Sequence, residues 1–131
     1  MNPTGTYELT GSEGYEAYLD SIGVSAPNRE AMASPEQTVT VRQEGDYYTL
    51  TTTSPAGTHL DQFTLGQEYR AVYGDGRGLK GISRRDGNRL IQQLDLGTAQ
   101  TTTIHEFRDA GFEVTYIGVN ANAKRTYKRL A

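Results

Sequence analysis

Residues 5–24, GTYELTGSEGYEAYLDSIGV, decide the fold because a strand pattern runs there into a helix pattern. TYELTG at 6–11 is rich in residues that favour β-strands. Tyr15, Tyr18, Leu19 and Ile22 then fall at i, i+3, i+4 and i+7, which is one face of a helix. Gly23 is a natural C-terminal stop for that helix. The stretch therefore predicts a first strand followed by a short helix.

A second short helix is predicted before the chain returns to strands. Pro27 suits the first turn of a helix, and Ser34-Pro35 ends it because the residue before a proline is biased away from helical geometry. Helical sequence is thus confined to 14–34, between the first strand and all the others.

The rest of the chain consists of short strand-forming runs separated by turns, as is typical of a β protein. Glycine-containing turn signals recur at short intervals, and Asp-Gly at 86–87 is a strong hairpin signal. Nine runs rich in Thr, Val, Tyr and Ile lie between the turns: 37–43, 47–53, 58–65, 68–73, 79–84, 89–94, 100–107, 112–118 and 123–130. Short strands at even spacing predict a sandwich or an up-and-down barrel.

Alternation along three of these runs says which side chains share a face. The shared sets are Phe112, Val114 and Tyr116; Thr101, Thr103, His105 and Phe107; and Ala123, Arg125, Tyr127 and Arg129. Lys124, Thr126 and Lys128 point the other way. A slip of one residue would reverse each assignment, so alternation alone leaves open which face is inside.

The composition limits the classes of protein that the chain can belong to. It has 131 residues, which is one domain, and only 35% are hydrophobic; nine are tyrosines and none is tryptophan. The interior is therefore either small or partly polar, or the sheet wraps around something. The absence of cysteine excludes disulfides, and a net charge of −3 argues against bulk nucleic-acid binding. Neither a secretory signal nor a bilayer-spanning run is present, so we expect a cytoplasmic protein.

At this point the residues resemble a known family, the intracellular lipid-binding proteins, which include the fatty-acid-binding proteins and their retinoid- and bile-acid-binding relatives. The resemblance runs from residue 5 to residue 131 with essentially no gaps. It rests on the N-terminal signature, FTLG at 63–66, the TTT ahead of Glu106, and RTY at 125–127. The signature residues are Gly5, Tyr7, Leu9, Gly14, Tyr15, Glu16, Tyr18, Leu19 and Ile22.

This resemblance implies an all-β fold of the calycin type over the single domain 1–131. Ten antiparallel strands would form an up-and-down barrel, and the two helices between the first and second strands would form its lid. Arg125 and Tyr127 would face the cavity and bind a ligand carboxylate. The family usually has a further arginine on the strand at 101–107, where this chain has His105.

The residue types at these positions fit a carboxylate. A guanidinium stays charged and can donate two parallel hydrogen bonds to a carboxylate, and a tyrosine adds a neutral donor. Histidine carries charge only when protonated, so His105 removes a permanent positive charge. We therefore expect weaker or pH-dependent anchoring, or a ligand whose head group is not a simple carboxylate.

Other positions are expected at the cavity or its portal by the same resemblance. They are Tyr15, Tyr18, Arg29, Ala56, Asp75, Arg77, Val114 and Tyr116. Ala56 stands in a turn where the family often has phenylalanine, and a smaller side chain there could widen the entrance. The plainer interpretation of Arg29, Asp75 and Arg77 is an ordinary solvated surface.

Nothing in the sequence supports catalysis, a metal or a cofactor. The glycine run at 74–81 lacks the GKS or GKT of a phosphate loop and is better explained as a hairpin turn. Two histidines without cysteine make a zinc site improbable. No Gly-x-Ser-x-Gly nucleophile elbow occurs.

We therefore expect a monomeric, non-enzymatic transport protein that carries one long-chain fatty acid in the cytoplasm. The alternative within the family is a bulkier lipid, a bile acid or a retinoid. A second class is a docking module whose exposed basic residues, among them Lys124 and Lys128, contact anionic membranes transiently. Entry into the nucleus stays open.

Overall fold

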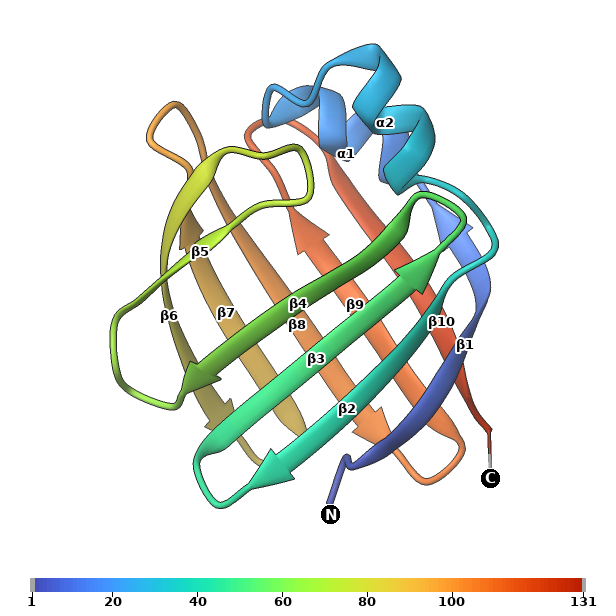
Figure 1. Cartoon of the computed structure of the whole chain (residues 1–131), viewed down its shortest axis with the longest axis vertical. Helices are drawn as coiled ribbons and strands as arrows, with labels where there is room; N and C mark the ends of the chain where they lie inside the picture. Colours follow the sequence, from blue (N-terminus) through green and yellow to red (C-terminus); the bar gives the residue numbers. More distant parts are fainter. Residues whose placement is uncertain (1, 131) are drawn as a thin grey trace.

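The structure is a computed structural model and describes residues 2–130. It contains ten strands and two helices (Figure 1). In chain order they are β1 (Gly5–Glu13), α1 (Tyr15–Ser21), α2 (Ala26–Met32), β2 (Thr38–Glu44), β3 (Tyr47–Ser54), β4 (Gly57–Thr64), β5 (Tyr69–Val72), β6 (Gly78–Asp86), β7 (Arg89–Asp95), β8 (Gln100–Arg108), β9 (Gly111–Ile117) and β10 (Asn122–Leu130). The predicted order of strand, two helices and nine strands is confirmed.

The strands form one antiparallel sheet that curls into a nearly closed barrel. Each strand pairs with its neighbour in sequence from β2 to β4 and from β5 to β10, and β1 pairs with both β2 and β10. β4 and β5 are the two ends of this order, and no ladder joins them in the part of the chain that the structure describes. The predicted up-and-down barrel of ten strands is thus confirmed.

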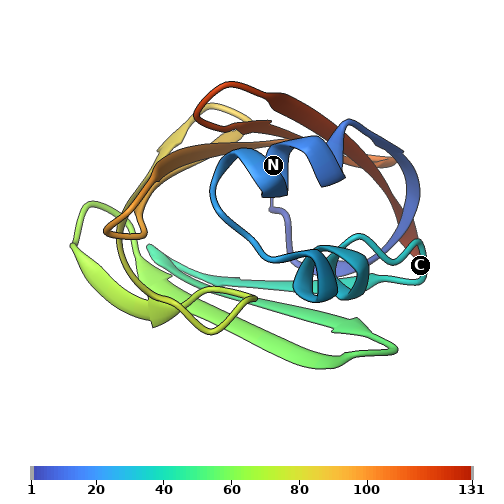
Figure 2. The same ribbon diagram turned by 90° about the horizontal axis from the view of Figure 1, so that it is seen from above.

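The two helices lie together over one end of the barrel, as the view from above shows (Figure 2). α1 follows β1 at Gly14, whose φ of 70° lies in the left-handed region. A Cβ at that position would come within 2.9 Å of the backbone oxygen of Asn122. Glycine is therefore required where the chain turns from the wall of the barrel into the lid. Among the described residues, neither helix has the length and apolar character needed to cross a bilayer.

Two clusters of buried side chains stabilise the barrel, one formed by the strands alone and one under the lid. The strand cluster contains Tyr7, Val39, Val41, Tyr48, Leu50, Phe63, Leu90, Phe107, Phe112, Val114 and Tyr127. The lid cluster contains Tyr18, Leu19, Ile22, Val24, Leu79, Leu94, Leu96 and Ala123. Since Tyr18, Leu19 and Ile22 all belong to the second cluster, the predicted apolar face of the first helix is the face that holds the lid in place.

Burial shows which faces of β8 and β10 point into the barrel. On β10, Arg125 and Tyr127 are 1% and 5% exposed, whereas Lys124, Thr126 and Lys128 are exposed. On β8, all four members of the set Thr101, Thr103, His105 and Phe107 are buried. The basic stretch at 124–129 therefore has two faces, one toward solvent and one toward the interior.

Candidate ligand-binding site

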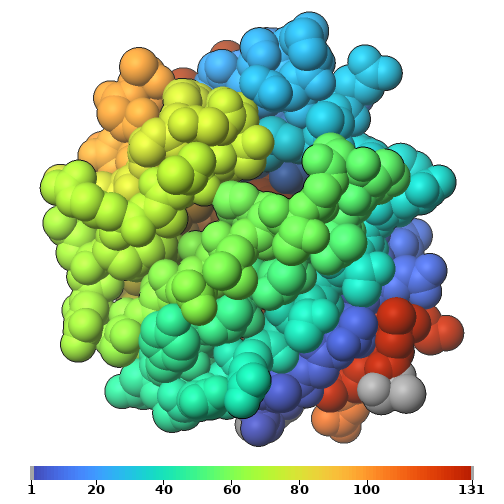
Figure 3. Space-filling model, in the orientation of Figure 1, coloured from blue at the N-terminus to red at the C-terminus, as the bar shows by residue number. Residues whose placement is uncertain are grey.

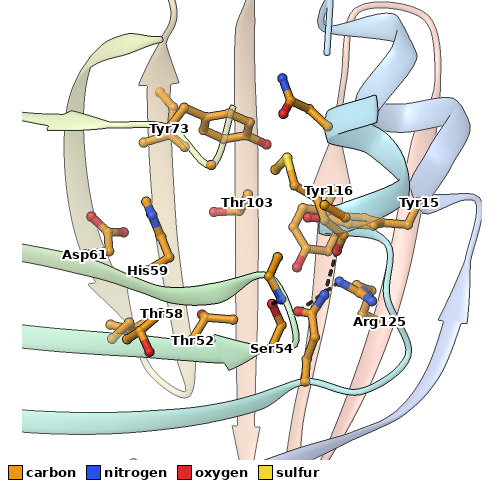
Figure 4. A pocket seen from close by; sticks show the side chains of 18 of the residues that line it. Tyr15, Thr52, Ser54, Thr58, His59, Asp61, Tyr73, Thr103, Tyr116 and Arg125 are labelled. Carbon is orange, nitrogen blue, oxygen red and sulfur yellow. Dashed lines mark hydrogen bonds between the residues drawn. The ribbon is translucent and has the colours of Figure 1, made fainter. Parts of the chain in front are cut away.

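A cavity of about 340 Å³ lies inside the barrel beneath the lid. Side chains from both helices and from most of the strands line it (Figure 4). The lining includes a few apolar side chains, mainly Met32, Leu50, Leu79 and Leu94, and a larger number of polar ones. Of the alternatives that the composition left open, a partly polar interior is the one observed. The space-filling view shows the surface hollowed between β4 and the lid and between β4 and β5 (Figure 3).

Arg125 is the only arginine on this wall among the described residues, and its side chain is almost fully buried. Its Nη1 donates to the side-chain oxygen of Gln37 at 3.4 Å, and its Nη2 donates to the carbonyl of Ser34 at 3.3 Å. The buried Nε of Arg125 has no hydrogen-bond partner in the described chain. The face of the guanidinium lies over the ring of Tyr15, 4.1 Å from its centre.

The positive charge of Arg125 is therefore buried without a counter-ion. No carboxylate of residues 2–130 lies within ion-pair distance of it, and both of its hydrogen bonds are long and go to neutral acceptors. Burying an unpaired charge is costly, so the fold maintains an unfavourable arrangement at this point. A bound anion would relieve it.

Three tyrosines surround Arg125 on the cavity wall. Tyr127 stacks on Phe112 with ring centres 4.6 Å apart, and Tyr15 and Tyr116 pack with centres 4.9 Å apart. Burial raises the pKa of all three hydroxyls above the ordinary value of tyrosine. The hydroxyls consequently stay protonated at neutral pH and can donate hydrogen bonds.

His105 lines the same cavity but contributes no charge near neutral pH. Burial lowers the pKa of its imidazole to about 4, opposed by a hydrogen bond to the backbone of Leu90. Its ring packs between Phe107 and Phe112, with centres 6.2 and 5.7 Å away. The buried Nδ1 has no hydrogen-bond partner among the described residues. In the free protein His105 is thus a neutral group with an unused nitrogen, which argues against pH-dependent anchoring near neutral pH.

The remaining cavity and portal predictions divide into three groups. Ala56, in the turn between β3 and β4, lines the cavity with Tyr15 and Tyr116. Tyr18 and Val114 are fully buried in the two core clusters and pack behind the wall. Arg29, Asp75 and Arg77 are not among the lining residues and instead hold the lid.

Arg77 joins three segments at the rim of the barrel. Its Nε donates to Asp75 at 2.8 Å, and its Nη1 donates to the carbonyl of Ile22 at 2.8 Å and to the hydroxyl of Thr98 at 3.3 Å. The side chain of Asp75 is only 5% exposed, so this is not a solvated surface pair. Arg29 makes a more exposed link by donating to Asp20 at 3.1 Å and to the carbonyl of Val24.

A second polar group in the cavity was not predicted. It consists of Asp61 and His59 on β4 with Gln92 on β7 and Thr103 on β8. Burial raises the pKa of the Asp61 carboxyl, opposed by a hydrogen bond from Gln92. Alternation along the fourth strand from Phe63 is the signal that could have placed Asp61 inside.

Comparison with known proteins shows what this arrangement is similar to. No protein-family model matches the chain. The chain is 30% identical to a fatty-acid-binding protein of Tyrophagus putrescentiae over 125 residues, covering 95% of each protein.

Solved structures agree with that relationship. The crystal structure of a brain fatty-acid-binding protein of Drosophila melanogaster is 38% identical, with a TM-score of 0.87 and coverage of 96% of this chain and 98% of that one. The Schistosoma mansoni fatty-acid-binding protein in complex with arachidonic acid is 26% identical, with a TM-score of 0.93 and coverage of 98% and 96%. The chain belongs to the intracellular lipid-binding protein family, in its fatty-acid-binding branch.

Proposed function

We propose that this protein is a non-enzymatic carrier that sequesters one long-chain fatty acid inside the barrel. The carboxylate of the ligand binds Arg125 and Tyr127, and His105 donates a further hydrogen bond to it as a neutral group. The tail lies along the leucines and tyrosine rings of the wall. The carrier acts as a monomer in the cytoplasm, and exposed Lys124 and Lys128 allow transient contact with anionic membranes.

One observation carries this proposal: the buried guanidinium of Arg125 has no counter-ion in the described protein. A carboxylate is the anion that a fatty acid supplies, and it matches the guanidinium with two parallel hydrogen bonds. Arg125 and His105 both line the cavity, and the unused Nε of Arg125, together with Nδ1 of His105 in its Nδ1–H tautomer, would provide further donors for its oxygens. The names of the relatives, including the complex with arachidonic acid, support the same class of ligand.

The energy of the tail is sufficient for binding. About sixteen methylenes at ~0.8 kcal/mol each give roughly 13 kcal/mol of gross transfer free energy. Loss of motion and ordering of the chain consume a large part of this, which leaves a dissociation constant between about micromolar and nanomolar. A cavity of about 340 Å³ is near the lower end of the usual range for ligand pockets, so it suits a slender chain better than the rigid rings of a bile acid.

The experiment that tests the proposal compares two charge deletions on the same strand. Arg125→Leu removes the inward cation, and Lys124→Leu removes the neighbouring outward one, which pairs with Glu113 at 3.5 Å on the surface. Calorimetric titration with oleate and with its methyl ester measures both head-group and tail recognition, after native mass spectrometry has confirmed that bound lipid has been removed.

We expect oleate to bind the Arg125→Leu protein about 10- to 100-fold more weakly, since one charged hydrogen-bonding partner is lost. Lys124→Leu should bind as the parent protein does, and the methyl ester should not distinguish the three proteins. Equal loss of oleate affinity in both variants would contradict the assignment of the carboxylate to Arg125. Failure of the parent protein to bind any fatty acid would refute the proposed function itself.

A further inference from the structure

Asp61 points into the barrel because of the register of its strand. Tyr48 on β3 is paired with Phe63 on β4, and these two buried rings stack with centres 5.6 Å apart on the inner face. Side chains two residues apart on a strand share a face. The next inward position of β4 is therefore Asp61, paired with Leu50, and both line the cavity.

The carboxylate of Asp61 is only partly used by the protein. Gln92 Nε2 donates to its Oδ2 at 3.1 Å, while the same amide reaches the Tyr69 hydroxyl at 3.2 Å. Thr103 donates to Gln92 Oε1 at 3.1 Å, which fixes the orientation of the amide. In residues 2–130, no lysine or arginine pairs with Asp61 and no hydrogen bond reaches its Oδ1. One acceptor oxygen is thus left for a ligand.

This acidic group lies away from the cationic one. β4 and β10 are four places apart in the strand order, so Asp61 and Arg125 belong to different walls of the barrel. The close view shows Asp61 and His59 on one side of the cavity and Arg125, Tyr15 and Tyr116 on the other (Figure 4). The cavity therefore has two polar ends of different character, and Thr52 lies between them in the view of Figure 4.

We propose that Asp61, Gln92 and Thr103 form a second polar subsite that binds a hydroxyl group on the tail of the fatty acid. This rests on the proposed function, because the carboxylate of the same ligand occupies the Arg125 end. A hydroxyl can donate a hydrogen bond to Asp61 Oδ1 and accept one from a polar neighbour. Plain methylenes beside the carboxylate would displace the water that solvates it without forming a hydrogen bond in its place. A hydroxyl is favoured over an ammonium because Asp61, unlike Arg125, is only half-buried and already accepts a hydrogen bond from Gln92, so its charge does not require a counter-ion.

The test measures the preference between matched ligands that differ by one hydroxyl. The pairs are 12-hydroxyoctadecanoic with octadecanoic acid and 16-hydroxyhexadecanoic with hexadecanoic acid, titrated into the parent protein, Asp61→Leu and Gln62→Leu. Gln62 is the next residue on β4 and faces solvent, so its replacement introduces the same leucine on the outer face.

We expect the parent protein to prefer the hydroxylated member of at least one pair by about 5- to 10-fold, which is the net value of one buried hydrogen bond. Asp61→Leu should reverse the preference by weakening the hydroxylated acid and tightening the plain one, and Gln62→Leu should keep it. Binding of both plain acids with no preference in either pair would overturn the subsite while leaving the carrier function intact. A preference that survives Asp61→Leu would overturn it as well.

Discussion

The guanidinium of Arg125 on β10 lies over the aromatic ring of Tyr15 on α1, with 4.1 Å between its central carbon and the ring centre. Tyr15 is the first residue of the lid helix, and Arg125 is the proposed anchor for the ligand carboxylate. A desolvated cation over an aromatic face is stabilised by about 2 kcal/mol. The lid and the anion site therefore share one interaction, and a change in either affects the other.

Replacing Tyr15 with leucine should weaken the packing of the lid and the support of the Arg125 guanidinium at the anion site. The substitution removes the aromatic face beneath Arg125 and the ring packing against Tyr18 and Tyr116. We expect the free energy of unfolding, measured with urea, to fall by about 2–3 kcal/mol. Tyr15→Phe keeps the ring and loses only the hydroxyl, so it should cost less than half as much. Equal losses in the two variants would show that the hydroxyl, and not the stacked ring, holds Arg125.

Most of the fold could be predicted from the sequence because its signals are local. Turn glycines, strand-forming runs and the helical face from Tyr15 to Ile22 each act within a few residues of chain, and every predicted strand is present. Which face of each strand points into the barrel could not be predicted from local sequence signals. It followed from the family resemblance of RTY at 125–127, and the burial of Arg125 and Tyr127 agrees with it.

The contacts that were not predicted join residues far apart in the sequence. Asp61 belongs to the site because Gln92, thirty-one residues away, reaches it across the interior. Arg77 was expected at the portal, but its hydrogen bond to the carbonyl of Ile22, fifty-five residues earlier in the chain, was not predicted. Neither partner can be identified from the spacing of residues along one strand, since the curvature of the barrel decides which side chains meet.

Arg77 should control how firmly the lid is closed. Arg77→Met removes its hydrogen bonds to Ile22 and Thr98 and the ion pair with the nearly buried carboxylate of Asp75, which keeps only the backbone N–H of residue 77 as a donor. We expect the free energy of unfolding to fall by about 1–3 kcal/mol, since Arg77 itself is partly exposed. Amide hydrogen exchange should accelerate in α1 and in the turn before β8, and bound fatty acid should dissociate faster.

The matched control for this change is Arg29→Met. Arg29 also ties the lid, but its partner Asp20 is 73% exposed, so the ion pair should contribute less than about 1 kcal/mol. Hydrogen exchange in the turn before β8 should not respond to it. If the two variants accelerate exchange in α1 equally, the buried position of Asp75 has no special importance for the lid.

His105 should make the protein less stable in mild acid. Its pKa is about 4 in the folded state and 6.5 in the unfolded state, so between these values the unfolded chain binds more protons. The stability that His105 contributes as a neutral group is therefore present above about pH 6.5 and is lost as the pH falls toward 4. A difference of about 2.5 pKa units corresponds to roughly 3 kcal/mol.

The measurement compares the parent protein with His105→Gln at pH 7 and near pH 4.5. The carboxylates are the same in both proteins, so their titration cancels when the two pH-dependent losses are subtracted. We expect the parent protein to lose about 2–3 kcal/mol more than His105→Gln between these pH values. If the two proteins lose the same free energy of unfolding between these pH values, His105 takes up its proton inside the folded barrel near its ordinary pKa. It could then supply the second positive charge that the sequence lacks, and oleate affinity would rise below pH 6.5.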